Sequence, residues 1–388
     1  METKEKKKEP DLSKLVPWNS NENPLKVNSI RYNQDYSLLV IATSKGYKIF
    51  SSLTYKSLEE KNEEINNFDD IHVADTYYSS SIVLLLPSKF NKNYQNNEII
   101  FFDDYFKKKI ASFKLKNEYI MNFYTCKNLI IIITINKLII IELISLKVID
   151  IIEDIAYNDK ILSFNSSNNS IAYTKAIDRK TLYINIYKDE KNFITSRKSI
   201  KINTNFDFIQ IFQFSPSGKY IVVSSIFGNK IHIYNTADGN LKNCFFLGPK
   251  IQTFERIFFS EKKPNYLLFI KNDKNLNVYK LGKYKDKEIN YKCICNLDND
   301  QDLVNRISQF EEQNQGNSNK INRSLSKNKN IKEPHVFTDF DERLLFGDFD
   351  RNKHKDIVLI NKKGKLFKYH FNKKKGGKIA PIISVQWI

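Results

Sequence analysis

The amino-acid sequence predicts an all-β protein built as a seven-bladed β-propeller. Runs of β-branched and aromatic residues alternate with short polar turns, and the resulting hairpins recur mostly at intervals of about 40 to 50 residues, longer where insertions fall. Helical periodicity is not sustained anywhere, apart from a possible short helix over residues 302–313. The chain has 388 residues, of which 41% are hydrophobic and 13% aromatic, so it has enough apolar material for one large core.

Seven hairpins define the repeating unit, and each consists of two apolar runs around a polar turn. They cover residues 38–52, 98–115, 128–143, 169–188, 219–236, 265–281 and 354–371. Repetition of a four-stranded antiparallel unit at this period is typical of propeller blades. The third hairpin lies in the longest apolar run, residues 128–146, which we considered as a membrane span. Asn136, Lys137 and Glu142 interrupt that run, so the sequence favours a hairpin.

The propeller is expected to occupy residues 25–388, after a flexible N-terminal tail over residues 1–24. The tail is charged and has no apolar segment, so we do not expect it to be a signal peptide. Two polar insertions are predicted, at about residues 54–70 and 282–335. The second is rich in Asn, Lys and Ser, and we expect it to project from the sixth unit without burying much apolar area.

The formal net charge of +18 favours anionic partners such as nucleic acid or a membrane surface. A compositional bias explains much of the same excess, because Lys, Asn and Ile are used throughout the chain. The four cysteines are too few for a disulfide scaffold, and their spacing does not match a zinc site. We therefore expect Cys126, Cys244, Cys293 and Cys295 to be reduced thiols in the cytosol.

Residues 28–52 closely resemble the first blade of the PROPPINs, the phosphoinositide-binding, WD40-like propellers of autophagy. The matching motifs are Asn-Gln-Asp at residues 33–35 and Thr-Ser-Lys-Gly-Tyr at residues 43–47. Residues 214–239 look like the family's fifth blade and residues 346–371 like its last blade. The likeness spans nearly the whole chain and is weakest in the second to fourth units. It implies a seven-bladed propeller with a lipid site on its rim.

The signature of that lipid site is altered in this chain. PROPPINs follow the fifth blade with Phe-Arg-Arg-Gly or Leu-Arg-Arg-Gly, and one arginine faces each of two lipid pockets. The matching residues here are Phe245, Phe246, Leu247 and Gly248, so both arginines are missing. Around them Ser225 is kept, Asn229 replaces a threonine, His232 replaces an arginine, and Ile270 and Lys271 replace a serine pair. Ser225, Asn229 and His232 are the candidate remnants of the lipid site. His232 is also interpreted, more simply, as an outward strand histidine.

Three cations near this segment are candidate replacements for the arginines: Lys250, Arg256 and Lys271. They are also what an ordinary solvated surface would carry. Phe246 and Leu247 then have two explanations. Either the pair fills the former pocket and is covered, or it forms an exposed apolar patch for a protein partner. The sequence favours the covered pair, although strand alternation should point one of the two outward.

No catalytic or metal site is predicted. The five histidines form no metal-binding pair, and no nucleophile elbow or Gly-rich phosphate loop is present. Residues 348–356 place oxygens at Asp348, Asp350, Asn352 and Asp356, a spacing that suits Ca²⁺. Arg351 and Lys353 replace the turn glycines of such loops, so a plain interstrand loop is favoured. No cofactor is expected.

The resemblance implies a non-enzymatic, cytoplasmic scaffold that recruits protein partners at membranes in autophagy or vesicle trafficking. Its lipid would be phosphatidylinositol 3-phosphate or 3,5-bisphosphate, on endosomal, vacuolar or autophagic membranes, bound through a weakened site. The alternative is a protein-interaction WD-repeat scaffold that binds no phosphoinositide. Nucleic acid is not expected, because no recognised binding module is present. We expect a monomer.

Overall fold

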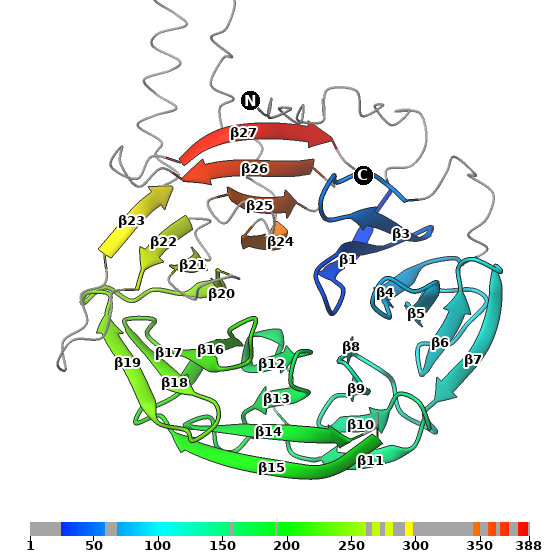
Figure 1. The fold of residues 1–388 in the computed structure, drawn as a ribbon, viewed down its shortest axis with the longest axis horizontal. Helices are drawn as coiled ribbons and strands as arrows, with labels where there is room; N and C mark the ends of the chain where they lie inside the picture. The colour runs from blue at the N-terminus through cyan, green and yellow to red at the C-terminus, as the bar shows by residue number, and fades with distance from the viewer. Residues whose placement is uncertain are drawn as a thin grey trace, which may run out of the picture.

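The computed structural model forms a closed ring of antiparallel sheets (Figure 1). It describes residues 25–58, 68–155, 158–190, 193–260, 266–271, 276–281, 292–297, 344–349, 356–361, 365–371 and 379–386. Six sheets have four strands and one has three. We call the three-stranded sheet the first sheet and number the others blades two to seven along the chain. The prediction of an all-β propeller is confirmed.

In each sheet the first strand lies innermost and the last outermost (Figure 1). The first sheet contains β1 (Val27–Tyr32), β2 (Leu38–Thr43) and β3 (Gly46–Ser51). Blade two contains β4 (Ile71–Thr76), β5 (Ile82–Pro87), β6 (Glu98–Asp103) and β7 (Lys108–Lys114). Blade three contains β8 (Asn122–Thr125), β9 (Leu129–Ile133), β10 (Leu138–Glu142) and β11 (Val148–Ile152). Blade four contains β12 (Leu162–Asn165), β13 (Ser170–Tyr173), β14 (Thr181–Glu190) and β15 (Phe193–Asn203).

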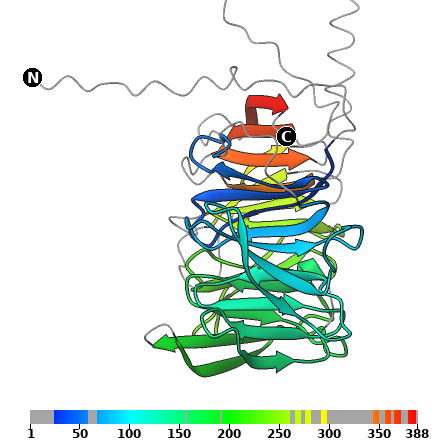
Figure 2. The same cartoon turned by 90° about the vertical axis from the view of Figure 1, so that its right-hand side faces the viewer.

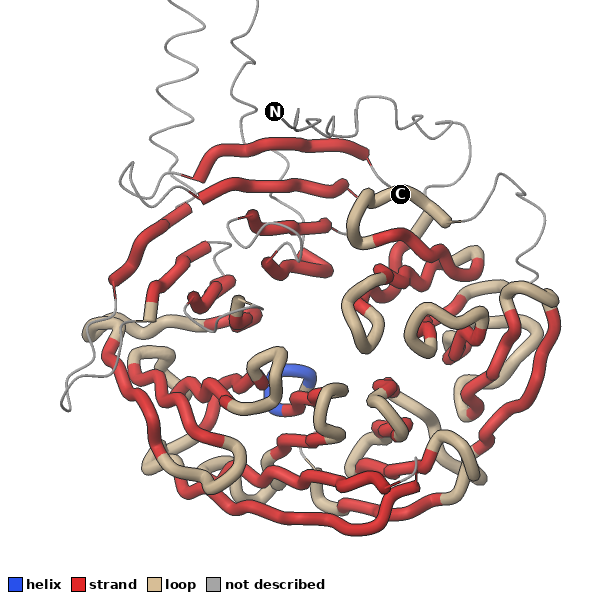
Figure 3. Tube along the Cα trace, in the orientation of Figure 1, coloured by secondary structure: helices blue, strands red, loops and turns tan. Residues whose placement is uncertain are grey.

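Blade five contains β16 (Ile209–Phe214), β17 (Tyr220–Ser225), β18 (Lys230–Asn235) and β19 (Leu241–Phe246). Blade six contains β20 (Phe254–Phe259), β21 (Tyr266–Lys271), β22 (Leu276–Lys280) and β23 (Lys292–Leu297). Blade seven contains β24 (Leu344–Phe349), β25 (Asp356–Asn361), β26 (Lys365–Phe371) and β27 (Ile379–Gln386). One short 3₁₀ helix, η2 (Asp159–Ile161), is the helical element of the described chain (Figure 3). The prediction of almost no helix is confirmed for these residues.

The expectation of seven four-stranded blades is wrong for the first sheet, which has three strands among the described residues. Residues 56–58 nevertheless follow the outer edge of β3. The Ser51 N–H donates to the Lys56 carbonyl and the Leu58 N–H to the Ile49 carbonyl, both at 3.0 Å. Tyr55 and Phe68, at the two ends of the predicted first insertion, are buried. The insertion is therefore shorter than 54–70, and its middle, residues 59–67, lies outside the described chain.

The predicted second insertion is also wrong in its boundaries. Residues 292–297 form β23, the outer strand of blade six, in which Leu297 pairs with Leu276 of β22. A short strand with a Cys-Ile-Cys centre was overlooked because polar residues surround it on both sides. The rest of 282–335 lies outside the described residues, and so do the predicted tail over 1–24 and the possible helix over 302–313.

Apolar side chains fill the spaces between neighbouring blades, which explains why the second and third strands read as continuous hydrophobic runs. All five residues of β9 are buried, as are all five of β10. The hairpin predicted over 128–143 is thus confirmed. In the described part of the chain no helix is long and apolar enough to cross a membrane. The outer strands are largely exposed, as the pattern along β7 shows.

The Asn-Gln-Asp motif of the first sheet ties neighbouring sheets together. The Gln34 side chain donates to the Thr76 carbonyl at 2.9 Å and accepts from the Tyr78 N–H at 2.6 Å. Asn33 donates to the Tyr78 carbonyl at 3.0 Å. Across the ring, the Ser166 hydroxyl donates to the Gln34 carbonyl at 3.0 Å. The motif that carries the family resemblance therefore has a structural role in linking the first sheet to blades two and four.

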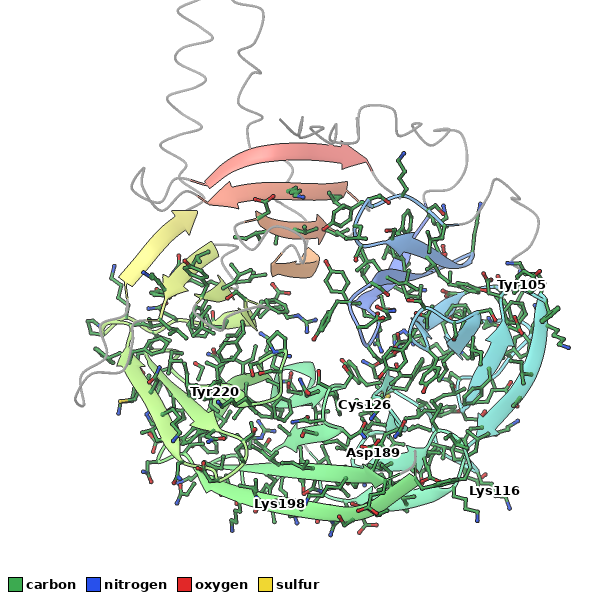
Figure 4. All side chains as sticks on the ribbon, in the orientation of Figure 1. Tyr105, Lys116, Cys126, Asp189, Lys198 and Tyr220 are labelled. Atoms are coloured by element: carbon green, nitrogen blue, oxygen red, sulfur yellow. The ribbon has the colours of Figure 1, made fainter. Side chains whose placement is uncertain are left out.

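Blade four carries a longer outer ribbon than the other blades. Strands β14 and β15 have 10 and 11 residues, and the ribbon projects past its neighbours in the side view (Figure 2). Its Asp189 accepts from Lys127 at 3.0 Å and from the Asn128 side chain at 2.8 Å (Figure 4). The end of the ribbon therefore contacts the turn between β8 and β9 of blade three.

Candidate functional site

Ser225 and Asn229, which the resemblance assigns to lipid binding, form hydrogen bonds within the turn between β17 and β18. The Ser225 hydroxyl donates to Asn229 Oδ1 at 3.2 Å and accepts from the Lys230 N–H at 3.2 Å. Gly228 takes a positive φ of 64°, and its N–H donates to the Ser225 carbonyl at 2.8 Å. Ser225 and Asn229 are thus brought together, but they bind each other within the turn. Ser225 is also buried.

The link from β19 to β20 packs directly on this turn. A Cβ at Gly228 would lie 1.8 Å from the Gln252 carbonyl oxygen, so only glycine fits. The Gln252 N–H donates to the Phe227 carbonyl at 2.8 Å. Gln210 donates to the Ile226 carbonyl at 2.8 Å and accepts from the Phe254 N–H at 3.0 Å. These bonds fix blade five against blade six.

His232 is half-buried on β18, between the buried Ile231 and Ile233. Its ring lies 4.3 Å from the Phe206 ring, and its Nδ1 is 2.8 Å from the Tyr234 hydroxyl. Burial, with a smaller contribution from Lys230, lowers the pKa of His232 to about 4. The imidazole is therefore neutral at physiological pH and has no positive charge to offer a phosphate. The ring is half-buried and packs against the Phe206 and Tyr234 rings, and its role in lipid binding stays a prediction.

The Phe-Phe-Leu-Gly segment divides between core and surface. Phe245 is buried in the apolar cluster between blades five and six, and Leu247 packs partly against the same cluster. Phe246 is 46% exposed. Strand alternation along β19 explains the division, since Phe245 and Phe246 point to opposite faces. The preference for a covered Phe246–Leu247 pair is therefore wrong for Phe246 and holds in part for Leu247.

The three candidate cations do not form one compact cluster. Arg256 lies opposite Ile270 in the β20–β21 register, one residue from Lys271, so these two are close in the sheet. Arg256 is exposed and Lys271 is half-buried. Lys250 is exposed in the link before β20, next to Gly248 and Pro249. Nothing tests their role in lipid binding, which stays a prediction.

Sequence reasoning missed most of an apolar surface beside Phe246. Five exposed apolar side chains lie at this end of blade five, and we call them the blade-five patch: Phe208, Ile226, Phe227, Phe246 and Ile251, which are 48%, 39%, 47%, 46% and 69% exposed. Backbone bonds hold them together. The Ile226 N–H donates to the Phe208 carbonyl at 2.8 Å, and Phe246 pairs with Lys230. The signal in the sequence was an apolar Ile-Phe pair at the tip of a polar turn.

Cations surround the blade-five patch. Lys230, Lys250 and Arg256 are exposed beside it, and so is Arg179, whose carbonyl accepts the Ile209 N–H at 2.9 Å. Asp207 is an exposed acid at the same end. In this part of the molecule the exposed cations therefore outnumber the exposed acid. Such a surface suits an acidic partner with an apolar face.

The described residues show no group of three or more metal-ligating side chains. In the segment considered for Ca²⁺, Asp348 lies on β24 and Asp356 on β25, and residues 350–355 lie outside the description. Asp356 is buried and forms an ion pair with Lys368 at 3.6 Å. Cys126 and Cys244 are free thiols, the first buried and the second exposed. The side chains of Cys293 and Cys295 lie outside the description.

No protein-family model matches the chain. Among solved structures, it is similar to Kluyveromyces lactis Hsv2, with 12% identity, a TM-score of 0.67, and 94% of this chain and 100% of that chain covered. Hsv2 from Kluyveromyces marxianus gives 13% identity and a TM-score of 0.63, with 95% and 100% covered. KlAtg21, solved in complex with the coiled-coil of AgAtg16, gives 12%, a TM-score of 0.58, and 93% and 99% covered. Because Hsv2 and Atg21 are PROPPINs, the chain has a PROPPIN-like β-propeller fold.

Proposed function

We propose that this chain is a non-enzymatic β-propeller scaffold that recruits a protein partner through the blade-five patch. The observation that carries the proposal is the exposure of five apolar side chains at one end of blade five, among them Phe246, which stands where the resemblance places a phosphate-binding arginine. A gathering of exposed apolar side chains is typical of interaction sites on soluble proteins. By analogy with the PROPPINs, the scaffold acts in the cytoplasm, on the periphery of endosomal, vacuolar or autophagic membranes. We also count the first sheet as a seventh blade.

A specific phosphoinositide site is disfavoured by the same geometry. Ser225 and Asn229 satisfy each other, His232 is neutral, and the two arginines are replaced by Phe246 and Leu247. Losing two charge-assisted phosphate contacts costs roughly 3 to 6 kcal/mol. That loss is enough to abolish a micromolar site. Binding to anionic membranes would then not select one headgroup, with Lys250, Arg256 and Lys271 contributing as surface cations.

The chemistry of the blade-five patch indicates the kind of partner. Aromatic side chains such as Phe227 and Phe246 are the groups that dominate protein interfaces once they are desolvated. The surrounding cations would steer an acidic segment towards them. We therefore infer that the partner contributes an amphipathic acidic segment whose apolar face covers the patch.

Vesicle binding tests the lipid side of the proposal. The full chain is mixed with vesicles that contain phosphatidylinositol 3-phosphate, or phosphatidylserine at matched charge, at low and at physiological salt. We expect equal binding to both vesicles, weakening together as salt rises, because screening acts on net charge and not on a specific site. Salt-resistant binding that prefers the phosphoinositide would contradict the proposal and assign the arginines' role to the replacement cations.

Proximity labelling in cells tests the protein side. Phe227→Asp places a charge in the blade-five patch, and Leu241→Asp is the matched control, because Leu241 is 48% exposed on the outer strand of the same blade. We expect Phe227→Asp to lose one set of labelled neighbours that wild type and Leu241→Asp retain. Identical labelling by all three proteins would count against the patch as the recruiting surface.

A further inference from the structure

The turn between β6 and β7 in blade two presents two aromatic rings to solvent. Tyr105 and Phe106 are 79% and 66% exposed, and the turn lies at the outer rim of the ring (Figure 4). The two rings meet edge to face, with their centroids 4.9 Å apart. We call residues 105–109, Tyr-Phe-Lys-Lys-Lys, the blade-two tip. Two neighbouring rings left in water at the end of a hairpin are unusual unless a partner covers them.

Side chains and backbone hold the blade-two tip in one conformation. Asp103 Oδ1 accepts the N–H groups of Tyr105 and Phe106 at 3.0 and 3.1 Å. The Asp104 N–H donates to the Ser81 carbonyl at 2.8 Å, and the Asp104 carboxylate accepts the Tyr47 hydroxyl. Lys107 takes a positive φ of 50° and its Nζ lies 2.8 Å from Asp104. A tip this constrained loses little conformational freedom when it binds.

Three lysines, residues 107–109, directly follow the two rings in the chain. Lys108 Nζ lies 5.3 Å from the centroid of the Phe106 ring, and Lys107 and Lys109 are exposed beside it. Lys109 has a partial counter-charge in Glu98, 3.7 Å away. Ile110, the next residue of β7, is 51% exposed. Lys114 at the end of β7 is also exposed, and so is Lys116, which lies farther along the same rim (Figure 4).

We propose that the blade-two tip anchors the propeller on the surface of a bilayer that contains anionic lipids. Aromatic rings prefer the headgroup level of a bilayer, and each lysine near an anionic surface raises binding about fivefold. A protein partner is less well matched, because a stable interface needs about 800 Å² on each side and the tip is a single hairpin turn. The contact uses none of the residues of the blade-five patch.

Depth-dependent quenching tests where the tip sits. Phe106→Trp is made in a background with Trp18→Phe and Trp387→Phe, and the protein is mixed with phosphatidylserine-containing vesicles whose lipids are brominated at known depths. We expect strong quenching from the shallowest bromines. Ile177→Trp is the control, since Ile177 is 90% exposed on blade four and should stay unquenched. Quenching of the control but not of position 106 would overturn the proposal.

Flotation with phosphatidylserine-containing vesicles tests the contribution of each group. Tyr105→Ser with Phe106→Ser should lower binding at physiological salt by more than about tenfold. Lys108→Ala should lower it about fivefold, whereas Lys242→Ala, an exposed lysine on blade five, should change it less than about twofold. Thermal unfolding of each variant confirms that the propeller is intact.

The same assay separates the two proposals. Phe227→Ser should leave vesicle binding unchanged, because the blade-five patch is assigned to a protein. If wild type fails to bind these vesicles, or if the double serine variant binds as well as wild type, the blade-two tip is not a membrane anchor. Binding of the two rings to a purified protein, with no binding to vesicles, would also overturn the proposal. None of these three results would bear on partner recruitment by the blade-five patch.

Discussion

The blade-five patch and the blade-two tip both expose apolar side chains beside lysines, yet they are built differently. The patch is assembled from three segments distant in sequence, around residues 208, 226–227 and 246–251, joined by backbone bonds within blade five and to the link that follows it. The tip is a single hairpin turn held by its own aspartates. A surface gathered from several segments offers area and suits a folded or folding partner. A projecting pair of rings offers little area and suits a deformable lipid surface.

Their positions also differ. Each blade has two ends. The turn between the second and third strands lies at the same end as the link to the next blade, as the bond from Gln252 to Phe227 shows. The turn between the third and outer strands lies at the other end, where Thr236 donates to the Gly218 carbonyl. The patch belongs to the first kind of end and the tip to the second. One propeller could therefore hold a membrane and a protein at the same time.

The largest expected effect separates the buried and exposed phenylalanines of β19. Phe245→Ala should lower the free energy of unfolding by about 3 to 5 kcal/mol, because Phe245 fills the core between blades five and six. Phe246→Ala should cost less than about 1 kcal/mol, because its ring is already 46% exposed. Urea denaturation of the two variants measures both. Equal losses would mean that Phe246 belongs to the core and that the patch is smaller than described.

The next effect concerns the turn that displays Ile226 and Phe227. Gly228→Ala should destabilise the protein by about 3 kcal/mol, because it combines a positive φ with a clash against the Gln252 carbonyl. Gly248→Ala is the matched control, since its φ is 104° but its Cβ would meet nothing within 4 Å. We expect it to cost about 1 kcal/mol, from strain alone. A Gly228→Ala protein as stable as Gly248→Ala would show that the link moves freely over the turn.

A smaller effect tests whether His232 in blade five becomes protonated in the folded protein. Burial lowers the pKa of His232 to about 4, below the ordinary value of 6.5. As pH falls through 6.5 the unfolded chain takes a proton that the folded chain refuses, so stability falls between about pH 6.5 and 4. After screening of the half-buried ring, the loss should be about 1 to 2 kcal/mol, and it should be absent in His232→Gln. Nuclear magnetic resonance titration of the imidazole, with and without inorganic phosphate, would give the pKa directly. A pKa near 6.5 that rises with phosphate would restore a phosphate site.

The sequence predicted the fold well because a blade hairpin is a local pattern. The run 38–52 gave β2 and β3, and 128–143 gave β9 and β10, since each strand is set by β-branched residues and its turn by polar ones. The boundaries were weaker where apolar signals are few. The strand 292–297 was hidden in a polar stretch, and residues 56–58 join the first sheet through backbone bonds that no side-chain pattern announces.

The candidate site was predicted less completely, because exposure depends on neighbours that are remote in sequence. Alternation along β19 foretold that one residue of the segment would face outward. It could not show that Phe208 and Ile251 would gather beside it, because they come from other strands and links. Similarly, Asp-Asp-Tyr-Phe-Lys-Lys-Lys was predicted only as part of the hairpin over residues 98–115. Its significance came from the exposure of both rings and from the bonds that fix them.

The smallest expected effect decides whether rigidity of the blade-two tip matters or only its charge. The two N–H bonds from the turn hold the pKa of Asp103 below its usual value, the bond from Phe106 most strongly, so the carboxylate is ionised at neutral pH. Asp103→Asn keeps an oxygen acceptor for those bonds and removes one negative charge, so it should bind anionic vesicles about fivefold more tightly. Asp103→Ala removes the same charge together with the acceptor, which frees the rings. If a preorganised tip is needed, Asp103→Ala should bind several-fold more weakly than Asp103→Asn, because ordering the rings then opposes binding. Flotation at physiological salt compares wild type with the two variants. Equal binding by Asp103→Asn and Asp103→Ala would mean that the charge of the tip matters and its rigidity does not.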